Sequence, residues 1–189
     1  MRKEIIEHIG SLAAGKRFKN VLNIGAADCH KGEFPDLRTL IRCDKYIGID
    51  LDETNPYVDQ KMDARNLQFK DDSFDLVICA ETLEHIDDIF KAASEIKRVL
   101  VKGGLLFISV PFILGFHDYP GDYWRITPAG MDFLFRGLQQ KHLVLIGGGS
   151  EITPITIITI YANRNVTNLL CLQVSLKQAQ KELLFITHS

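Results

Sequence analysis

The stretch VLNIGAADCHKG, residues 21–32, begins like a buried strand and runs into a loop. A short apolar run that ends in glycine is typical of a strand covered on both faces. Only Gly25 stands where a cofactor-binding loop would carry several glycines. This stretch alone leaves three interpretations open: the loop holds a nucleotide-like ligand, it once did, or the likeness is accidental.

The bulk properties of the chain favour one globular domain. Its 189 residues suit a single sizeable core, and 46% hydrophobic with 24% charged residues is an ordinary globular composition. The formal net charge of −2 gives no basic face for a phosphate backbone, which disfavours nucleic acid as a partner. The four cysteines form no C-x-x-C pair, so we expect reduced thiols and a cytoplasmic protein.

No segment of the sequence has the pattern of a targeting or membrane-spanning element. Residues 1–19 carry charges throughout and lack the continuous apolar core of a signal peptide. No apolar run approaches the roughly 20 residues that a transmembrane helix needs. The nearest candidate, ITPITIITIYA at 152–162, is short and contains Pro154, so we expect a buried strand, an edge strand or an interfacial segment.

Apolar periodicity predicts helices and strands in alternation. The expected helices cover 1–19, 35–42, 86–100 and 127–138, and the expected strands cover 20–25, 45–50, 57–63, 73–80, 103–111 and 142–148. In the helix at 86–100, Asp87 is the expected N-cap and Phe90 belongs to the expected apolar stripe. Thr127 is the expected N-cap of the next helix, with Pro128 in its first position. This alternation predicts an α/β fold, a doubly wound and mostly parallel sheet with helices on both faces.

Ligands of such sheets bind beyond the carboxyl ends of the strands, where the strand order reverses. The candidate site therefore comprises residues 25–29, 50–52, 63–64, 79–85 and the chain from 111 onward. Gly25 permits a tight turn and close approach of a ligand. Asp50 can accept both hydroxyl hydrogens of a ribose, and Asp63 can accept from the exocyclic amine of a base. Aspartates after strands also make turns and cap helices, but the two together favour adenosine binding.

Four segments carry a family resemblance: VLNIGAA, YIGIDLD, MDARNLQFKDDSFDLVICAETLEHIDD and EIKRVLVKGGLLFISVPF. In these segments, over about residues 20–138, the chain resembles the class I S-adenosylmethionine-dependent methyltransferases of the small, standalone type. The resemblance implies a Rossmann-like, seven-stranded sheet whose last strand is antiparallel. It also implies a single domain over 1–189, with an N-terminal helix at 1–19, a cofactor-binding core at 20–149 and a C-terminal strand and tail at 150–189.

The same resemblance implies where S-adenosylmethionine would bind. Residues 25–27 (Gly25, Ala26 and Ala27) would pass under the methionine part of the cofactor, Cys79 and Ala80 would line that end of the site, and Asn23 would accept a hydrogen bond from the amino group. Asp50 would accept hydrogen bonds from the ribose hydroxyls. Leu51 would pack on the adenine ring, and Asp63 with the Ala64 backbone would contact the adenine amine. The family usually has an acidic residue at the position of Asn23 and glycines at those of Ala27 and Cys29. Losing the acid removes a charge-assisted hydrogen bond, so we expect weakened cofactor binding.

Two other functions compete with the methyltransferase interpretation. The altered glycine loop is compatible with a protein that binds S-adenosylmethionine or S-adenosylhomocysteine without catalysis. A nicotinamide-dependent oxidoreductase is disfavoured, because G-x-G-x-x-G is absent from the sequence.

The acceptor end of the site is expected in FILGFHDYPGDYWR, residues 112–125. An oxygen acceptor must be placed in line with the methyl group and must lose a proton. The candidate catalytic residues are His117, Asp118 and Tyr123, with His117 as general base and Asp118 or Asp122 as its orienting carboxylate. The alternative is a structural turn in which Arg125 pairs with Asp122 and Trp124 joins the core.

The segment ETLEH places Glu81, Glu84 and His85 within one helical turn, where they could converge on a divalent cation. Its E-x-x-E-H spacing resembles the metal-binding motif of ubiquinone-pathway O-methyltransferases and of small-RNA 2′-O-methyltransferases. In the latter a more distal histidine joins, a part that His117 would play. An ion such as Mg²⁺ would act as a Lewis acid on the acceptor oxygen. The alternative is that L-E-H-I only shapes the start of a helix.

These patterns together predict methyl transfer from S-adenosylmethionine to a small polar acceptor, with an oxygen of a sugar or related metabolite as the expected target. HDYPGDYWRITPAGM, residues 117–131, resembles a block found in methyltransferases of sugar and surface-polysaccharide pathways. The expected partner is therefore a small molecule, and a homodimer is the expected form of any assembly.

Overall fold

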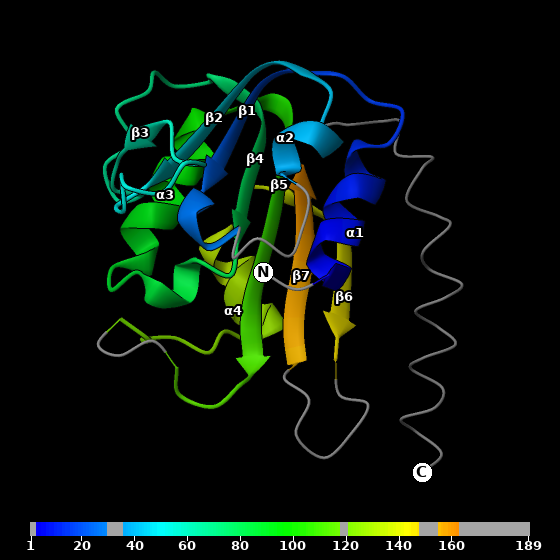
Figure 1. Cartoon of the computed structure of the whole chain (residues 1–189). Helices are drawn as coiled ribbons and strands as arrows, with labels where there is room; N and C mark the ends of the chain where they lie inside the picture. The colour runs from blue at the N-terminus through cyan, green and yellow to red at the C-terminus, as the bar shows by residue number, and fades with distance from the viewer. Residues whose placement is uncertain (1–2, 30–35, 118–120, 148–154, 163–189) are drawn as a thin grey trace.

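The computed structural model describes residues 3–29, 36–117, 121–147 and 155–162. Its centre is a seven-stranded sheet of order β3-β2-β1-β4-β5-β7-β6 (Figure 1). The strands are β1 (Phe18–Ile24), β2 (Cys43–Asp50), β3 (Gln60–Lys61), β4 (Phe74–Ala80), β5 (Leu100–Ile113), β6 (Gln139–Ile146) and β7 (Ile155–Ala162). The strands from β3 to β5 are parallel, and β7 is antiparallel to both β5 and β6. This arrangement confirms the predicted fold class.

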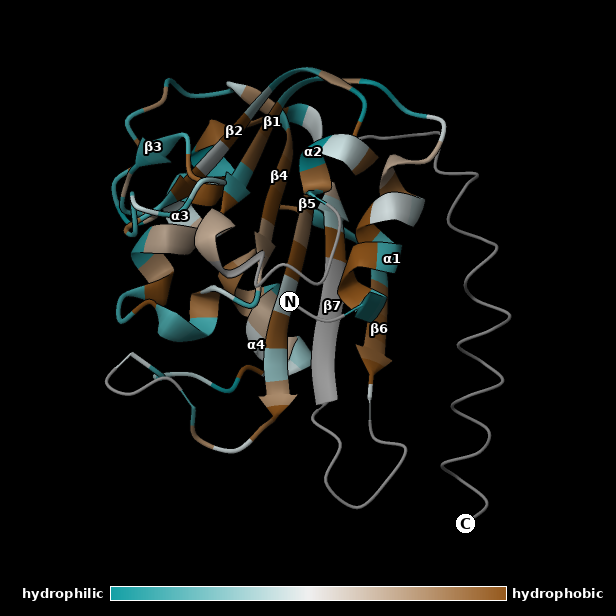
Figure 2. Ribbon diagram, in the orientation of Figure 1, coloured by the Kyte–Doolittle hydropathy of each residue, from teal (hydrophilic) through white to brown (hydrophobic). Residues whose placement is uncertain are grey.

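Helices cover both faces of the sheet (Figure 1), and the central strands β4 and β5 are mostly hydrophobic (Figure 2). One face packs against α1 (Lys3–Ala13) and α2 (Leu37–Leu40), and the other against α3 (Ile89–Val99) and α4 (Pro128–Leu134). Alternate residues of each strand supply the two cores: in β4, Leu76 and Ile78 face α1 while Val77 faces α3. No helix in the described ranges is long and apolar enough to cross a membrane.

Two short 3₁₀ turns bring the chain to the edge of the sheet where ligands are expected. The turn η1 (Ala26–Cys29) follows β1, and η2 (Leu83–His85) follows β4. Because β1 and β4 are adjacent parallel strands, both turns lie at their carboxyl ends. The sheet thereby places two segments far apart in sequence next to each other.

The start of α3 differs from the prediction in two ways. Its N-cap is Asp88, which accepts from the Lys91 amide, so the prediction of Asp87 was wrong. Phe90 is 58% exposed and does not belong to the inward stripe, because a helix that begins at Ile89 turns Ala92 and Ala93 toward the sheet instead. Thr127, in contrast, caps α4 as predicted, accepting from the Gly130 amide at 3.1 Å.

The Gly103–Gly104 pair lies within strand β5, whereas the sequence predicted a strand that begins at Gly103. β5 begins at Leu100 and continues through both glycines, with Gly103 at a φ of +82°. The pairing with β4 shifts register between Phe74 and Leu76, so the two glycines accommodate a bulge. Of the expected C-terminal segment at 150–189, only 155–162 falls within the described residues, and the boundaries proposed for the single domain stay a prediction.

Candidate active site

A cavity of about 310 Å³ opens at the carboxyl ends of β1, β2 and β4. Its volume falls at the lower end of the range for small-molecule sites, roughly 300 to 1,000 Å³. The lining residues come from four segments of the chain: Ile24, Gly25 and Ala27; Ile49, Asp50, Leu51 and Asp52; Met62, Asp63 and Ala64; and Thr82, His85 and Ile86. Six of the residues predicted for the cofactor, Gly25, Ala27, Asp50, Leu51, Asp63 and Ala64, are thus brought together.

Gly25 makes the turn that opens this cavity. Its φ of +77° lies in the left-handed region, and a β-carbon built there would lie 2.1 Å from Thr82 Oγ1. The Thr82 hydroxyl donates to the Ala80 carbonyl at 3.0 Å and lies 3.3 Å from that of Ile24. The ends of β1 and β4 therefore meet at Gly25 and Thr82. Thr82 lies within the candidate range 79–85, but sequence reasoning assigned it no role, because only the packing of the two strands brings it against the glycine.

The carboxylate of Asp50 organises the rim of the cavity. One oxygen accepts from the Ala27 amide and the other from the Asp52 amide, both at 3.1 Å. A carboxylate offers about four acceptor positions, so these bonds leave capacity for hydroxyl groups of a ligand. Beside it, Leu51 is 61% exposed and presents an apolar surface at the cavity.

Asp63 is held by a guanidinium that sequence reasoning did not identify. Arg65 donates from Nε to both Asp63 oxygens at 3.0 Å and from Nη2 to one of them at 2.7 Å, and it also pairs with Asp87. Hydrogen bonds from Arg65 lower the pKa of the Asp63 carboxyl, and Asp63 and Asp87 raise the pKa of Arg65. An adenine amine at Asp63 would therefore share a carboxylate already engaged by Arg65.

The other residues predicted for the cofactor are buried beside the cavity. Asn23, Ala26, Cys79 and Ala80 have little exposed surface, and none of the four is among the described residues that line the cavity. Cys79 belongs to the core against α3. Their roles toward the methionine part stay predictions.

The loop after β5 is built around Asp122, whose side chain is 1% exposed. Its oxygens accept from the His117 amide at 2.8 Å and from both terminal nitrogens of Arg125 at 2.6 and 2.8 Å. Hydrogen bonds from Arg125 hold the pKa of Asp122 far below its usual range. Asp122 Oδ2 also lies 3.2 Å from His117 Nδ1, and Arg125 Nη2 lies 3.4 Å from the same nitrogen. The role of Asp122 in orienting His117 stays a prediction. Asp118 lies outside the described residues.

The structural roles weighed for Arg125 and Trp124 are confirmed. Arg125 pairs with Asp122 and donates to the carbonyl oxygens of Leu114 and Gly115 at 3.0 and 2.9 Å. Trp124 packs against the core and donates from Nε1 to the Ile86 carbonyl at 2.9 Å. Tyr123 exposes half of its surface, and its amide donates to the Glu84 carbonyl at 2.8 Å. These bonds fasten the loop after β5 onto η2.

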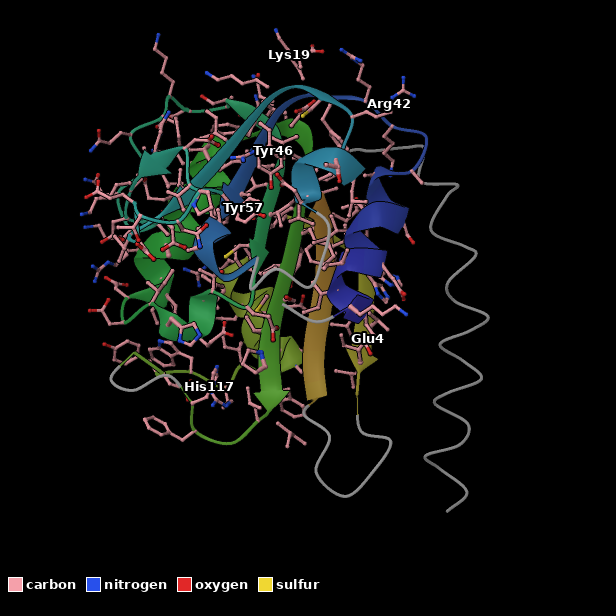
Figure 3. The ribbon with its side chains drawn as sticks, in the orientation of Figure 1. Glu4, Lys19, Arg42, Tyr46, Tyr57 and His117 are labelled. Carbon is pink, nitrogen blue, oxygen red and sulfur yellow. The ribbon has the colours of Figure 1, made fainter. Side chains whose placement is uncertain are left out.

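Three side chains that could hold a metal meet where that loop contacts η2. Ligand atoms of Glu84, His85 and His117 all lie within 4.8 Å of one another. Figure 3 shows His117 in the loop beyond the end of β5. The ring centroids of the two histidines are 5.1 Å apart, edge to face. The structure thus joins His117 to two of the predicted ligands, and Glu81 is not a member of this group among the described residues.

Comparison with known proteins supports the same fold. Residues 29–108 match the model of a family described as a methyltransferase domain. An uncharacterized protein of Methanocaldococcus jannaschii is 47% identical over 45 residues, which are 24% of this chain. The match spans 20% of that relative's length.

Solved structures resemble the whole described fold at low sequence identity. The YcgJ protein of Bacillus subtilis matches with a TM-score of 0.68 at 16% identity, covering 87% of this chain and 100% of its own. The N-methyltransferase NodS of Bradyrhizobium japonicum, in complex with S-adenosyl-L-homocysteine, matches with a TM-score of 0.68 at 18% identity, covering 86% and 87%. The [4+2]-cyclase SpnF matches with a TM-score of 0.64 at 15% identity, covering 86% of this chain and 82% of its own. Taken with the order of the strands, these likenesses show that the chain has the fold of the class I S-adenosylmethionine-dependent methyltransferases, and residues 29–108 match the methyltransferase-domain family.

Proposed function

We propose that this protein transfers a methyl group from S-adenosylmethionine to a small polar acceptor. The observation that carries the proposal is the cavity at the carboxyl ends of β1, β2 and β4, where Gly25, Asp50 and Asp63 line one space. The methyltransferase-domain match and the S-adenosyl-L-homocysteine in the NodS structure support the choice of cofactor. When bound, S-adenosylmethionine supplies a methyl group already activated by its sulfonium.

The residues present fit this cofactor. Gly25 lines the cavity with its backbone, which a ligand can approach, while the Thr82 side chain fills the space that a β-carbon would take. Asp50 keeps acceptor positions for ribose hydroxyls, and Leu51 offers an apolar surface for the adenine. Asp63, kept ionised by Arg65, would accept from the adenine amine. The missing acid at Asn23 predicts reduced affinity for the amino group rather than loss of the site.

At the acceptor end, His117 and Asp122 form a base with its orienting carboxylate. Asp122 Oδ2 lies 3.2 Å from His117 Nδ1, and Arg125 Nη2 lies 3.4 Å from the same nitrogen. With the imidazole proton on Nδ1 facing Asp122, Nε2 would carry the lone pair that takes the proton of an acceptor hydroxyl. We therefore favour an oxygen acceptor, and the resemblance of residues 117–131 to a sugar-pathway block suggests a sugar or related metabolite.

A second candidate function is cofactor binding without methyl transfer, with which the altered glycine loop at Ala27 and Cys29 is compatible. SpnF has the same fold and is a cyclase, so the fold does not fix the reaction. Turnover must therefore be tested separately from binding.

Isothermal titration with S-adenosylhomocysteine tests the cofactor site, with Asp50→Ala beside the unmodified protein. We expect micromolar binding that Asp50→Ala weakens at least tenfold, because the ribose hydroxyls lose the Asp50 carboxylate as their hydrogen-bond acceptor. Asp44→Ala, which removes an exposed carboxylate paired with Arg17, is the matched control and should bind normally. No binding at millimolar ligand would refute the proposal, whereas binding without methyl transfer to any of a panel of sugars and hydroxylated metabolites would favour the second candidate.

A further inference from the structure

Strand β6 exposes two leucines on a face of the sheet that is buried elsewhere. β6 is an edge strand of the sheet (Figure 1), and its end is hydrophobic (Figure 2). Val144 and Ile146 belong to the core against α1. Alternate side chains of a strand point to opposite faces, so Leu143 and Leu145 face the side of α3 and α4. They are 39% and 44% exposed, and neither joins the apolar clusters of the described residues.

The register of the sheet places these leucines at the margin of a buried core. Across β7, Leu143 lies in register with Ile108 of β5, and Leu145 lies in register with Val110. Ile108 and Val110 are completely buried in the core against α3 and α4. The same two rows therefore end on exposed leucines at the edge strand. Exposed apolar residues on an edge strand favour aggregation, and natural proteins commonly cover such an edge with a helix or loop.

The chain leaves the described residues beside this face. β7 ends at Ala162, which pairs with Gln139 at the start of β6. Residues 163–189 follow, and they lie outside the described residues. This segment therefore starts at one end of the strand that carries the exposed leucines.

The sequence of the segment has the pattern of an amphipathic helix. Its apolar residues recur at alternating intervals of three and four: Leu169, Leu172, Leu176, Ala179, Leu183 and Ile186. Asn168 stands directly before the first of them, where an N-cap is preferred. Residues 177–178 and 180–182 are Lys, Gln or Glu, which predicts a polar opposite face. Val174 and Phe185 fall outside the apolar stripe.

We propose that residues 169–186 form a helix that lies on Leu143 and Leu145 of the same chain. A helix of this length spans about 27 Å and an eight-residue strand spans about 26 Å, so the helix matches β6. A segment that turns back after β7 runs parallel to β6, because β6 and β7 are antiparallel. Counted from Leu169 and from Gln139, the rises per residue place Leu176 near Leu143 and Leu183 near Leu145.

A second copy of the chain is the competing occupant of this face. Two leucines offer far less than the roughly 1,200–2,000 Å² that a stable interface between proteins buries. The chain's own segment loses little translational freedom on docking, because the short tether at 163–168 keeps its effective concentration in about the millimolar range. The inference does not depend on the proposed function, since no described residue of β6 lines the cavity.

Hydrogen exchange of the full-length protein, followed by mass spectrometry, tests the docking. We expect residues 169–186 to exchange at least tenfold more slowly than a synthetic peptide of the same sequence. Leu143→Asp combined with Leu145→Asp should remove this protection, because the helix would then bury two carboxylates, while β1 and β4 stay protected. Phe90→Asp is the matched control and should leave the exchange of 169–186 unchanged, because Phe90 is 58% exposed and contacts Phe133 of α4.

Disulfide formation gives a second measurement, which does not require the docked helix to be stable in the aspartate variants. In a Cys171→Ser background, Leu143→Cys with Leu176→Cys should form an intrachain disulfide on mild oxidation. Leu143→Cys with Gln178→Cys is the control and should form none, because residue 178 lies about 200° around a helix from residue 176.

Exchange of 169–186 at the rate of the free peptide would overturn the inference, and so would the absence of an intrachain disulfide in the first pair. Protection that disappears on dilution, together with a doubled mass by light scattering, would assign the face to a second copy and would overturn it as well. All of these measurements are made without cofactor, so their failure is distinct from a failure of S-adenosylhomocysteine to bind.

Discussion

The α-carbon of Gly25 packs directly against the side chain of Thr82, so that a β-carbon on Gly25 would lie 2.1 Å from Thr82 Oγ1. This contact joins the end of β1 to the end of β4 at the mouth of the cavity. Gly25, the glycine that remains in this altered loop, is therefore required for two reasons. Its φ is positive, and Thr82 leaves no room for a β-carbon.

Gly25→Ala should lower both stability and affinity for S-adenosylhomocysteine. The left-handed backbone costs about 1–2 kcal/mol for a residue with a β-carbon, and the overlap with Thr82 adds about 1–3 kcal/mol. Gly15→Ala is the matched control, because Gly15 has a φ of +70° with nothing within 4 Å of the added carbon. Urea unfolding should show the larger loss at Gly25, and adding Thr82→Ala should recover part of it. Equal losses at the two glycines would contradict the role of the contact.

Arg65→Gln should weaken binding of S-adenosylhomocysteine by about tenfold, or about 1.4 kcal/mol. The variant frees the Asp63 carboxylate to change its orientation, because Asp63 loses its bonds from the Arg65 guanidinium. Calorimetric titration measures the effect. Arg17→Gln breaks an exposed pair with Asp44 and should leave the affinity unchanged. Tighter binding by Arg65→Gln would mean that Arg65 competes with the adenine for Asp63.

The melting temperature should fall as the pH drops below about 6.5, in part because of His142. Burial, followed by the charge of His8, lowers the pKa of His142 in the folded protein. Below about pH 6.5 this histidine therefore binds more protons in the unfolded chain than in the folded protein. The stability that His142 contributes is complete above about pH 6.5 and declines as the pH falls toward the lower pKa of the folded state. His142→Phe should flatten this dependence between pH 7 and pH 5. A pH profile unchanged by the substitution would refute the assignment to His142.

Arg98→Met should destabilise the fold by about 1–3 kcal/mol, the cost of leaving polar partners unsatisfied. Its guanidinium donates to the carbonyl oxygens of Leu67 and Phe69 at 2.8 and 2.7 Å and pairs with Glu95, which ties the segment before β4 to α3. Arg136→Met, at a residue stacked on the exposed Phe133 ring, should cost far less. Thermal unfolding compares the two, and equal losses would contradict the structural role of Arg98.

Sequence alone determined the alternation of strands and helices and the residues at the strand ends. Periodicity of apolar residues is a local property, and so are the caps and stops at Thr127 and Gly15. Because parallel strands end at one edge, Asp50 and Asp63 could be assigned to one site before their positions were known. The wrong prediction of Asp87 as the N-cap shows what a local pattern cannot decide. Two adjacent aspartates could cap α3, and the ion pair of Asp87 with Arg65 is a tertiary contact.

Only the tertiary structure decided which side chains meet across those segments. Thr82 faces Gly25 because β1 and β4 are neighbouring strands. Arg65 pairs with Asp87 through a loop whose conformation the sequence does not predict. The sequence predicted Glu81, Glu84 and His85 as one set of metal ligands that His117 could join, and the structure brings Glu84, His85 and His117 together. The loop after β5 folds back so that Gly121 and Asp122 hold His85 and His117 at Glu84, because backbone hydrogen bonds from that loop to η2 fix its path. The contact between His85 and the Gly121 carbonyl joins residues 36 positions apart, and no local pattern records it.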